Sequence, residues 1–344
     1  MADDIQAVDD IQAVEKLGQA RDAIVAELRK TIVGMDDVID EMMIAIFARG
    51  HCLLVGVPGL AKTLLVSSLA RTMSLSFKRI QFTPDLMPSD ITGTELLQED
   101  PETHDRRFKF QKGPVFTNLL LADEINRTPP KTQAALLEAM QEKRVSSGGE
   151  DFELDKPFFV LATQNPIEQE GTYPLPEAQL DRFLFNIMVK YPSHAEELGI
   201  MQSATNDDEP VLNEVVDGAT ILEFQHVVRR IPVADHVFKY AAALVRATRP
   251  DEPDAPEFVK KFMAWGAGPR ASLNLIVAGT SRAALRGRCH VSVDDIRELC
   301  LPILRHRIIP SFAARSEGMT ADNLIEKLVA EIPSDEKLLA RKTG

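Results

Sequence analysis

The sequence predicts an α/β domain followed by an all-helical domain, and three observations carry this prediction. A glycine-bearing loop at residues 56–63 lies between an apolar strand-like run and a helical pattern. Further apolar runs of strand length recur as far as Val189 and alternate with helical patterns, which is typical of an α/β domain. After Pro192 the apolar spacing is helical. Because 344 residues exceed what one core usually holds, we predict domains at residues 1–192 and 193–344.

The composition is that of a soluble globular protein, with 44% hydrophobic and 26% charged residues. The 52 acidic residues outnumber the 39 basic ones, and the formal net charge is -13. An acidic surface argues against a protein whose main task is to grip the phosphate backbone of nucleic acid. We therefore do not expect nucleic acid to be a partner.

The cysteines and histidines show no disulfide or metal-binding pattern. Cys52, Cys289 and Cys300 form no C-x-x-C pair, and the seven histidines lack the spacing of a zinc site. We expect reduced cysteines and no structural metal. The N-terminus is acidic where a signal peptide is basic, and no apolar run approaches the roughly 20 residues of a membrane span. These features predict a cytoplasmic protein without membrane insertion.

The N-terminal segment predicts two helices joined by a short apolar link. The sextet DDIQAV occurs twice in succession and merges into helical spacing that continues to Leu28; we assign no function to the repeat. A second helix is expected at residues 36–49. The link at residues 31–35 contains Val33 and Gly34. It either packs on an adenine ring or is a plain turn between helices.

A phosphate-binding loop is predicted where the first strand passes into a helix. Its residues are Gly56, Val57, Pro58, Gly59, Leu60, Ala61, Lys62, Thr63 and Leu64. Backbone N–H groups that converge at a helix N-terminus hold phosphates well. In such a site Lys62 would reach the β- and γ-phosphates of ATP, and the Thr63 hydroxyl would ligate Mg²⁺. Ala61 departs from the consensus G-x-x-x-x-G-K-[ST], and a simple Gly/Pro turn is the alternative for this stretch alone.

Two adjacent carboxylates follow an apolar strand about sixty residues after the lysine. They are Asp123 and Glu124, at the end of Leu-Leu-Leu-Ala. Asp123 would hold Mg²⁺ together with Thr63, while Glu124 would orient and polarise the attacking water. The alternative is a strand that ends in a solvated acidic turn.

Another buried strand, at residues 158–164, ends in a polar amide. Asn165 at that end could hydrogen-bond both the γ-phosphate and the attacking water. Equally, it could cap the turn before Pro166.

Two segments interrupt the expected core. Residues 83–111 are irregular, and the runs 91–97 and 108–110 within them could pair as a hairpin. Insertions of this kind usually sit on the surface and carry partner contacts. A second hairpin is predicted at residues 144–154, with the small, acidic tip Gly148-Gly149-Glu150-Asp151.

Arg182 lies just before the last strand-like run, at residues 185–189. An arginine that projects from the far side of the sheet cannot easily reach its own nucleotide, so an intersubunit role is one hypothesis. The alternative is a surface ion pair with Asp181, which would contribute little stability.

The segment after Pro192 carries helix signals. Ser193 and Thr220 each begin a capping box, and helical spacing covers residues 237–245, 272–285, 293–304 and 324–332. Gly268-Pro269 opens one helix and puts Arg270 at a domain edge. If this domain folds over the phosphate loop, Arg270 would touch the γ-phosphate and make the position of the domain depend on the nucleotide. A surface arginine in a plain N-terminal turn is the alternative.

The motifs GVPGLAKT, LLLADEINR, ATQNP, PLPEAQLDRF and GPRAS occur in this order. With them the chain resembles the MoxR family of AAA+ ATPases, in the branch marked by an insertion in helix 2 and a hairpin before sensor 1. The resemblance spans about Val14 to Ile332. The alanine at position 61 is itself typical of this family. It implies a P-loop AAA+ core, in which helices sandwich a parallel five-stranded sheet, followed by an all-α lid domain.

The resemblance also implies a role for each motif. The loop ending in Lys62 and Thr63 is similar to Walker A, and the Asp123–Glu124 pair is similar to Walker B. Asn165 corresponds to sensor 1.

The remaining correspondences concern the second domain and the neighbouring subunit. Arg270 is similar to sensor 2, and Arg182 resembles the arginine finger that completes the site of the next protomer. Val33 and Gly34 fall where the family contacts adenine. Such enzymes form hexameric rings, since each active site needs a donor from a neighbour.

We therefore predict an Mg-ATP-dependent ring ATPase that remodels protein clients. The resemblance implies chaperone-like action, often with a partner containing a von Willebrand factor A (VWA) domain, in the maturation of partner proteins or metalloenzymes. The alternatives are the AAA+ motor subunit of a metal chelatase and a nucleotide-gated assembly scaffold with little turnover. A DNA helicase is the weaker hypothesis, because the tip of the second hairpin is acidic where a phosphate-tracking hairpin would carry Lys or Arg.

Overall fold

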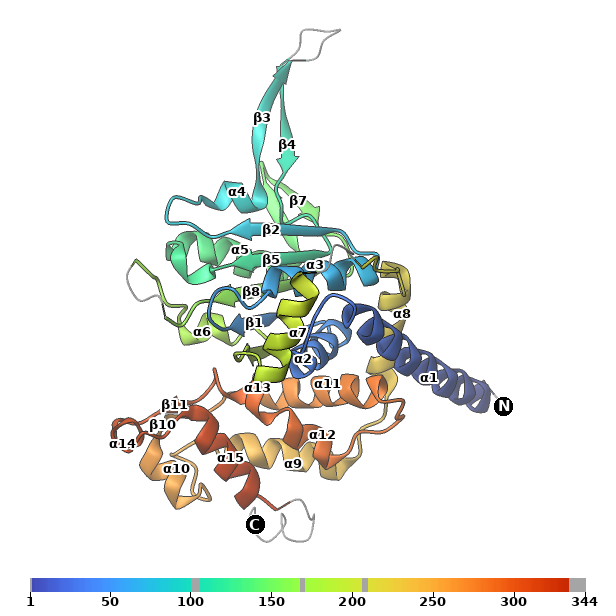
Figure 1. The fold of residues 1–344 in the computed structure, drawn as a ribbon. Helices are drawn as coiled ribbons and strands as arrows, with labels where there is room; N and C mark the ends of the chain where they lie inside the picture. Colours follow the sequence, from blue (N-terminus) through green and yellow to red (C-terminus); the bar gives the residue numbers. More distant parts are fainter. Residues whose placement is uncertain (1, 100–105, 168–170, 206–209, 334–344) are drawn as a thin grey trace.

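Five parallel strands form the central sheet of the computed structural model, which describes residues 2–99, 106–167, 171–205 and 210–333 (Figure 1). Their order across the sheet is β2-β5-β8-β1-β9, and every neighbouring pair is parallel. The strands are β1 (Cys52–Val55), β2 (Phe77–Gln81), β5 (Leu119–Asp123), β8 (Phe159–Gln164) and β9 (Phe185–Met188). This confirms the predicted five-stranded parallel sheet.

Helices cover both faces of the sheet, as predicted. In β5, Leu119 and Leu121 join one hydrophobic cluster while Leu120 and Ala122 join another, because successive side chains of a strand point to opposite faces. The first cluster contains residues of α1 (Ala2–Leu28), α2 (Asp36–Phe47) and α3 (Lys62–Thr72). The second contains residues of α5 (Pro130–Glu142).

Both predicted hairpins are present and lie on the same side of the core (Figure 1). The first consists of β3 (Gly93–Glu99) and β4 (Arg106–Lys112), and the second of β6 (Arg144–Ser147) and β7 (Glu150–Glu153). The first strand starts later than predicted, because Ile91 is buried in the short helix α4 (Pro88–Thr92). The rings of Phe110 and Phe152 stack at 4.2 Å and join the two hairpins.

Short helical segments connect the later strands, and the C-terminal part of the chain is helical apart from one short strand pair. The connecting segments are η1 (Ile125–Arg127) and α6 (Glu177–Leu180). The later helices are α7 (His194–Ala204), α8 (Gly218–Arg230), α9 (Asp235–Arg246), α10 (Glu257–Phe262), α11 (Pro269–Leu285), α12 (Val293–Glu298), α13 (Cys300–Leu304), α14 (Phe312–Ser316) and α15 (Ala321–Glu331). Strands β10 (Met263–Trp265) and β11 (Ile309–Pro310) pair antiparallel among them.

Two details of the helical prediction were wrong. Thr220 is not a capping residue, because α8 begins earlier and the Asp217 side chain accepts a hydrogen bond from the backbone N–H of Thr220. The helical pattern at residues 293–304 is divided at Leu299 into α12 and α13. Pro302 has no N–H to donate to the carbonyl of Glu298, so a continuous helix would lose that hydrogen bond.

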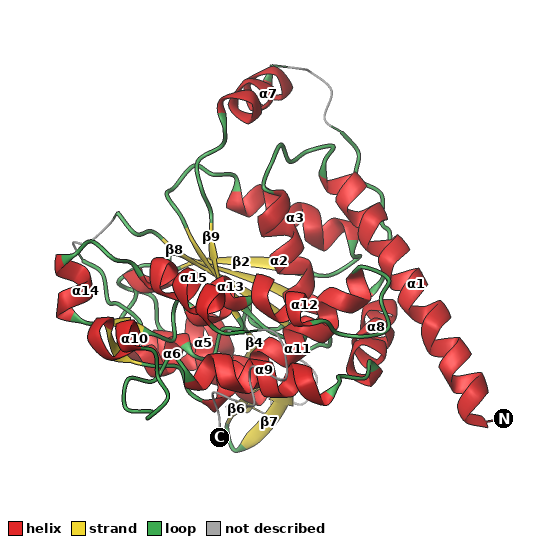
Figure 2. Ribbon diagram, turned by 90° about the horizontal axis from the view of Figure 1, so that it is seen from below, coloured by secondary structure: helices red, strands yellow, loops and turns green. Residues whose placement is uncertain are grey.

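The helical region packs against the α/β domain through α11. Ser281 Oγ in α11 donates a buried hydrogen bond of 2.8 Å to the carbonyl of Ile44 in α2. Figure 2, seen from below, shows the later helices in front of the sheet. Because one hydrophobic cluster continues from α2 through α8 into α11, the domain division at Pro192 stays a prediction. In the described part of the chain, no helix combines the length and apolarity that a bilayer span requires.

A buried carboxylate organises the turn between α11 and α12. Asp295 is fully buried and receives hydrogen bonds from Arg282, Arg288 and Ser292, the shortest being 2.5 Å. Burial opposes ionisation of Asp295, but these hydrogen bonds outweigh it and hold the pKa at about 2, below the ordinary value of 3.8. The carboxylate is therefore ionised in the folded protein.

We expect Asp295→Asn to lower the free energy of unfolding by about 3 kcal/mol, because two arginines lose their buried counter-ion. The folded pKa lies below the unfolded one, so the stabilisation by the ionised group is complete above about pH 4 and is lost as the pH falls toward 2. Urea denaturation at pH 7 and at pH 3 measures both effects. Asp294→Asn, at the exposed neighbouring position, is the control; equal stability of the two variants would contradict the assignment.

Candidate functional site

The loop between β1 and α3 is held in a turn that leaves little room at its start. Gly56 is buried, and a Cβ there would lie 2.8 Å from both the Cβ and the carbonyl oxygen of Val189. Gly59 has φ +84, with open space around it. Ala61, the residue that departs from the consensus, adopts φ 48 immediately before α3, in the left-handed region that glycine favours.

The lysine of the loop points back to the start of the turn. Lys62 Nζ donates a hydrogen bond of 2.6 Å to the carbonyl of Gly56. Burial lowers the pKa of Lys62, while the negative charges of Asp123 and Glu124 act in the opposite direction. The structure thus brings the lysine and the two carboxylates within electrostatic reach of each other.

Asp123 is held from two sides at the end of β5. Its Oδ1 accepts a hydrogen bond of 2.5 Å from the hydroxyl of Thr163 in β8, and its Oδ2 accepts one of 2.6 Å from Arg79 in β2. The parallel register explains these contacts, since β2 and β8 flank β5. The carboxylate orientation is therefore determined by the neighbouring strands.

Glu124 turns sharply out of the strand, with φ 56. Its backbone N–H donates to Thr163 Oγ1 at 2.9 Å. Its Oε2 accepts hydrogen bonds from Gln81 Nε2 at 2.7 Å and from Arg127 at 3.0 Å. The solvated acidic turn considered as an alternative is not what the structure contains, because this side chain is only about one-fifth exposed and has two partners.

Asn165 lies at the end of the strand next to the phosphate-binding loop. Val55 and Gln164 are partners in the β1–β8 register, and the N–H of Gly56 donates to the carbonyl of Gln164 at 3.2 Å. Asn165 is buried, and its Oδ1 accepts a hydrogen bond of 3.1 Å from the N–H of Ile167. In this structure the side chain caps the turn, as the alternative interpretation has it, while its position beside the loop leaves the sensor role as a prediction.

The predicted Arg270 and a second arginine, Arg307, both bind Asp181, which precedes Arg182 in the chain. Arg270 Nη1 donates to Asp181 Oδ2 at 3.1 Å, and Arg307 Nε donates to Asp181 Oδ1 at 2.7 Å. Asp181 does not pair with Arg182, so the alternative prediction of a surface ion pair between these two residues was wrong. The Arg182 side chain is half-buried and has no hydrogen-bond or ion-pair partner within the described part of the chain.

A cavity of about 1070 Å³ opens beside the phosphate-binding loop. Its lining includes Val33 together with Gly59, Leu60, Ala61 and Leu64 of the loop. The cavity continues toward charged side chains of α2 and the helical region, among them Asp40, Glu41, Arg282, Arg286 and Arg305. Its size and its mixed lining fit a molecule as large as a nucleotide.

Helix α7 forms one wall of this cavity. A Cβ on Gly34 would lie 2.3 Å from Oε1 of Glu196, and a Cβ on Gly199 would lie 3.2 Å from Val33. The predicted capping box is confirmed here, because Ser193 and Glu196 cap the start of α7 reciprocally. The link at residues 31–35 is therefore covered by a helix from beyond Pro192.

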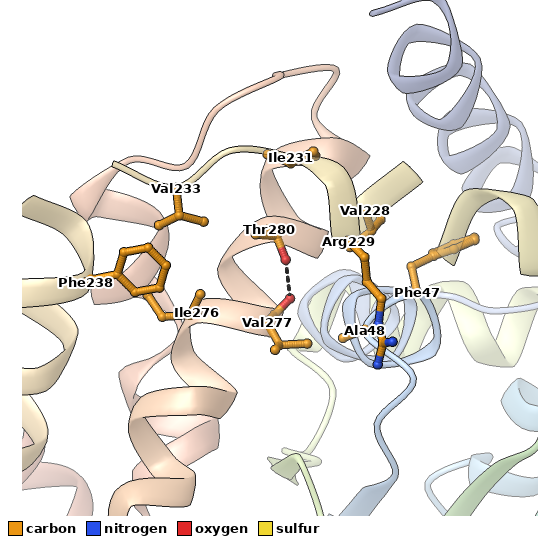
Figure 3. Close-up of a pocket in the computed structure, with 10 residues that line it drawn as sticks. All are labelled: Phe47, Ala48, Val228, Arg229, Ile231, Val233, Phe238, Ile276, Val277 and Thr280. Atoms are coloured by element: carbon orange, nitrogen blue, oxygen red, sulfur yellow. Dashed lines mark hydrogen bonds between the residues drawn. The ribbon is translucent and has the colours of Figure 1, made fainter. Parts of the chain in front are cut away.

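Figure 3 shows a second, smaller cavity of about 260 Å³, which contains none of the predicted site residues. It is enclosed mainly by apolar side chains of α2, α8, α9 and α11. The Thr280 hydroxyl donates to the carbonyl of Val277 within it, and Arg229 is the one charged residue of its lining. The residues that line this cavity include no phosphate-binding loop, so we assign the cavity no role.

Several residues that hold the site together could not be identified from the motifs alone. They are Arg79, Gln81, Arg127, Thr163 and Arg307. A signal existed for two of them: Gln81 ends one strand and Thr163 precedes Asn165 near the end of another, so both belong to the sheet edge that carries the carboxylates. No signal in the sequence pointed to Arg307, because its partners lie about 120 residues away in the sequence.

Comparisons with known proteins agree with this architecture. The model of the ATPase family associated with various cellular activities (AAA) matches residues 51–185, and the AAA lid domain model matches residues 257–328. The Mycobacterium tuberculosis protein named Chaperone MoxR1 is 43% identical over 306 residues, which cover 89% of this chain and 80% of that protein. The chain belongs to the MoxR family of AAA+ ATPases.

Other relatives extend this family assignment along nearly the whole chain. Bacillus subtilis YeaC is 40% identical, with 90% of this MoxR-family chain and 92% of YeaC covered. Protein MoxR of Methylorubrum extorquens is 30% identical, over 90% of this chain and 93% of its own length. A crystal structure from Cytophaga hutchinsonii superposes with a TM-score of 0.88 at 40% identity, covering 96% of this chain and 98% of that one.

We expect Gly56→Ala to lower the free energy of unfolding by about 1–3 kcal/mol, because the added Cβ must push Val189 or the loop aside. Ala61→Gly is the matched control. This substitution removes the strain of an alanine in the left-handed region but gives the unfolded chain more conformational freedom. We therefore expect the free energy of unfolding to change by less than about 1 kcal/mol. Chemical denaturation compares the two; a Gly56→Ala protein as stable as the parent would refute the close packing.

Proposed function

We propose that this MoxR-family chain hydrolyses ATP and uses the energy to remodel protein clients within a ring of identical subunits. The observation that carries the proposal is that the loop after β1, with Lys62, and the carboxylates at the end of β5, Asp123 and Glu124, lie at the same edge of the parallel sheet, with only β8 between the two strands. A phosphate-binding cation, a metal-binding carboxylate and a second carboxylate able to polarise water form the minimal equipment for phosphoryl transfer to water.

The side chains present fit ATP and Mg²⁺. The turn before α3 offers backbone N–H groups at a helix N-terminus, and Lys62 is already drawn into that turn by the Gly56 carbonyl. The Thr63 hydroxyl and the Asp123 carboxylate are hard oxygen donors, the type that Mg²⁺ prefers. When bound, the ion would neutralise charge that develops on the phosphates. The adjoining cavity, with Val33 in its lining, supports the adenine contact predicted for the link at residues 31–35.

Glu124 is the residue to which we assign activation of water. Its carboxylate is fixed by Gln81 and Arg127, and its backbone is fixed by Thr163. A carboxylate that accepts two hydrogen bonds on one oxygen retains lone pairs on the other for a water molecule. This arrangement argues against a pure nucleotide-gated scaffold, which has no need of an oriented base.

The side chain of Arg182 supports the proposal that the subunits form a ring. It is half-buried and has no partner within the residues that the structure describes, although it lies beside a segment held by two other arginines. We propose that it completes the site of a neighbouring subunit, where a guanidinium can stabilise charge on the transferring phosphoryl group. A hexamer is the ring size that the family resemblance implies.

The name of one relative and the charge of a surface hairpin both favour a protein as the client. One relative is named a chaperone, which supports a protein client, and a VWA-domain protein is the partner that the family resemblance implies. The β6–β7 hairpin carries Glu150, Asp151 and Glu153, and its turn consists of two glycines. Such a hairpin would repel the phosphates of DNA, so a protein client is favoured over nucleic acid.

We expect Glu124→Gln to reduce kcat at least about 100-fold while leaving ATP affinity within about threefold, because the amide keeps the volume but cannot act as a base. Steady-state ATPase assays and binding of a fluorescent ATP analogue measure the two quantities. Glu138→Gln, the same chemical change at an exposed position of α5, is the control. Full turnover by Glu124→Gln would exclude this residue as the base.

The ring predicts complementation between inactive variants. An Arg182→Ala subunit keeps its own loop and carboxylates, whereas a Lys62→Ala subunit still has an arginine to donate. Mixing the two should restore part of the ATPase activity that neither has alone, at sites where an intact loop meets a donated arginine. Co-purification through two different tags verifies mixing. Verified mixed assemblies without any recovered activity would contradict the trans role.

A further inference from the structure

Three consecutive residues of the helical region hold the segment that carries Arg182. Arg305 Nη1 donates to the carbonyl of Asn186 at 2.9 Å. The ring Nε2 of buried His306 lies 3.2 Å from the carbonyl oxygen of Phe183, a contact that requires Nε2 to carry the proton. Arg307 contributes the largest set of contacts. The helical region is thus attached to the start of β9 and to the turn before it.

Arg307 surrounds the Arg182 peptide unit with donors. Its side chain is 2% exposed. Besides Asp181 Oδ1, it donates to the carbonyls of Asp181 at 3.1 Å and Phe183 at 2.6 Å. It also reaches the carbonyls of Leu184 and Ile303. Since the carbonyls before and after Arg182 are bound by one guanidinium, the backbone at Arg182 cannot rotate without breaking several charge-assisted hydrogen bonds.

Asp181 divides its two carboxylate oxygens between two arginines of the helical region. Oδ1 takes Arg307 and Oδ2 takes Arg270. Arg270 is half-exposed and uses only Nη1 for this contact, so its Nε and Nη2 have no partner among the described residues. A guanidinium presents five N–H donors in a fixed plane, so Arg270 uses only part of its donor capacity to hold Asp181.

We propose that Asp181 and Arg307 are positioning residues that set the orientation in which Arg182 is offered to the neighbouring subunit. The inference rests on the proposed trans role of Arg182 and goes beyond it, because it names the contacts that hold the donated arginine in place. Arg307 binds the carbonyls on either side of Arg182, and Asp181, one peptide bond away, is held by Arg307 and Arg270 together.

The test isolates the donated arginine. In mixed rings of Arg182→Ala and Lys62→Ala subunits, only the first kind can hydrolyse ATP and only the second can donate an arginine. Asp181→Asn is added to the Lys62→Ala donor, whose own site is already inactive, so any effect acts on a neighbour. We expect the restored rate to fall at least about tenfold, since a misplacement of about 1 Å can cost 10²-fold.

Asp10→Asn in the same donor is the matched control. Asp10 pairs with Arg230 at 2.6 Å and is exposed to 32%, close to the 34% of Asp181, but it lies in α1, far along the chain from Arg182. This donor should restore the same rate as the unmodified one. Thermal denaturation and co-purification through two tags establish that each donor folds and enters rings.

A donor with Asp181→Asn that restores the full rate overturns the inference. If instead the unmodified Lys62→Ala donor restores nothing, the trans role of Arg182 has failed, which is a separate result. Should Asp181→Asn unfold the donor by leaving Arg307 unpaired, Arg270→Gln decides, because that side chain is half-exposed and its loss removes only one cation from Asp181. It should lower the restored rate about two- to threefold, because Asp181 then loses one of the two cations that hold it; an unchanged rate would overturn the inference.

A separate measurement distinguishes positioning from general damage. Asp181→Asn in an otherwise unmodified chain should lower kcat without changing nucleotide affinity by more than about threefold, because Asp181 touches neither the loop nor the carboxylates. A parallel loss of affinity and activity would indicate a damaged fold and would contradict a positioning role.

Discussion

The parallel register of β5 between β2 and β8 is the constraint on which the candidate site depends. It sets Gln81 opposite Asp123 and Ala122 opposite Ala162, so that Thr163 comes next to the carboxylates. One hydroxyl then donates to Asp123 and accepts from the Glu124 N–H. A shift of a single residue would turn these side chains to the opposite face, because the strand repeat is two. The burial of alternate leucines in two separate cores makes such a shift costly.

The helical region contributes to the site through buried charge and not only through apolar packing. Burial disfavours the charged form of Arg307 and lowers its pKa, and the carboxylate of Asp181 compensates in the opposite direction. Four backbone carbonyls use the remaining donors. Removing one partner of such a buried pair leaves an uncompensated charge, so the geometry around Arg182 is strongly determined. These contacts let the helical region control the orientation of Arg182, the residue proposed to act on a neighbouring subunit.

Two of the six residues other than glycine that have positive φ in the described chain lie where chemistry is expected. Ala61 before α3 and Glu124 after β5 both have positive φ without being glycine. Each costs on the order of 1–2 kcal/mol, and each persists because surrounding contacts hold it. For Glu124 these contacts are the Thr163 hydroxyl, Gln81 and Arg127. The positive φ turns the Glu124 carboxylate out of the strand direction and toward Gln81.

The fold class and most of the site could be predicted from the sequence because their signals are local. A strand, a glycine-bearing turn and a helix adjoin in the chain around Lys62, and two carboxylates directly follow an apolar strand. Helix ends were less predictable. Asp217 and Thr220 are both residue types that cap helices, and the structure shows that Asp217 caps α8 by accepting a hydrogen bond from the Thr220 N–H.

Taken alone, the amino-acid order predicted which residues would carry phosphate, metal and water chemistry, since those predictions depend on side-chain type and on neighbours in the chain. The tertiary structure alone decided how they are oriented. Thr163, Gln81 and Arg307 act across strands or domains, and the covering of the link at residues 31–35 by α7 joins segments about 160 residues apart. Contacts of that kind leave no periodic pattern in a single sequence, because they depend on register and packing, which arise only when the whole core closes.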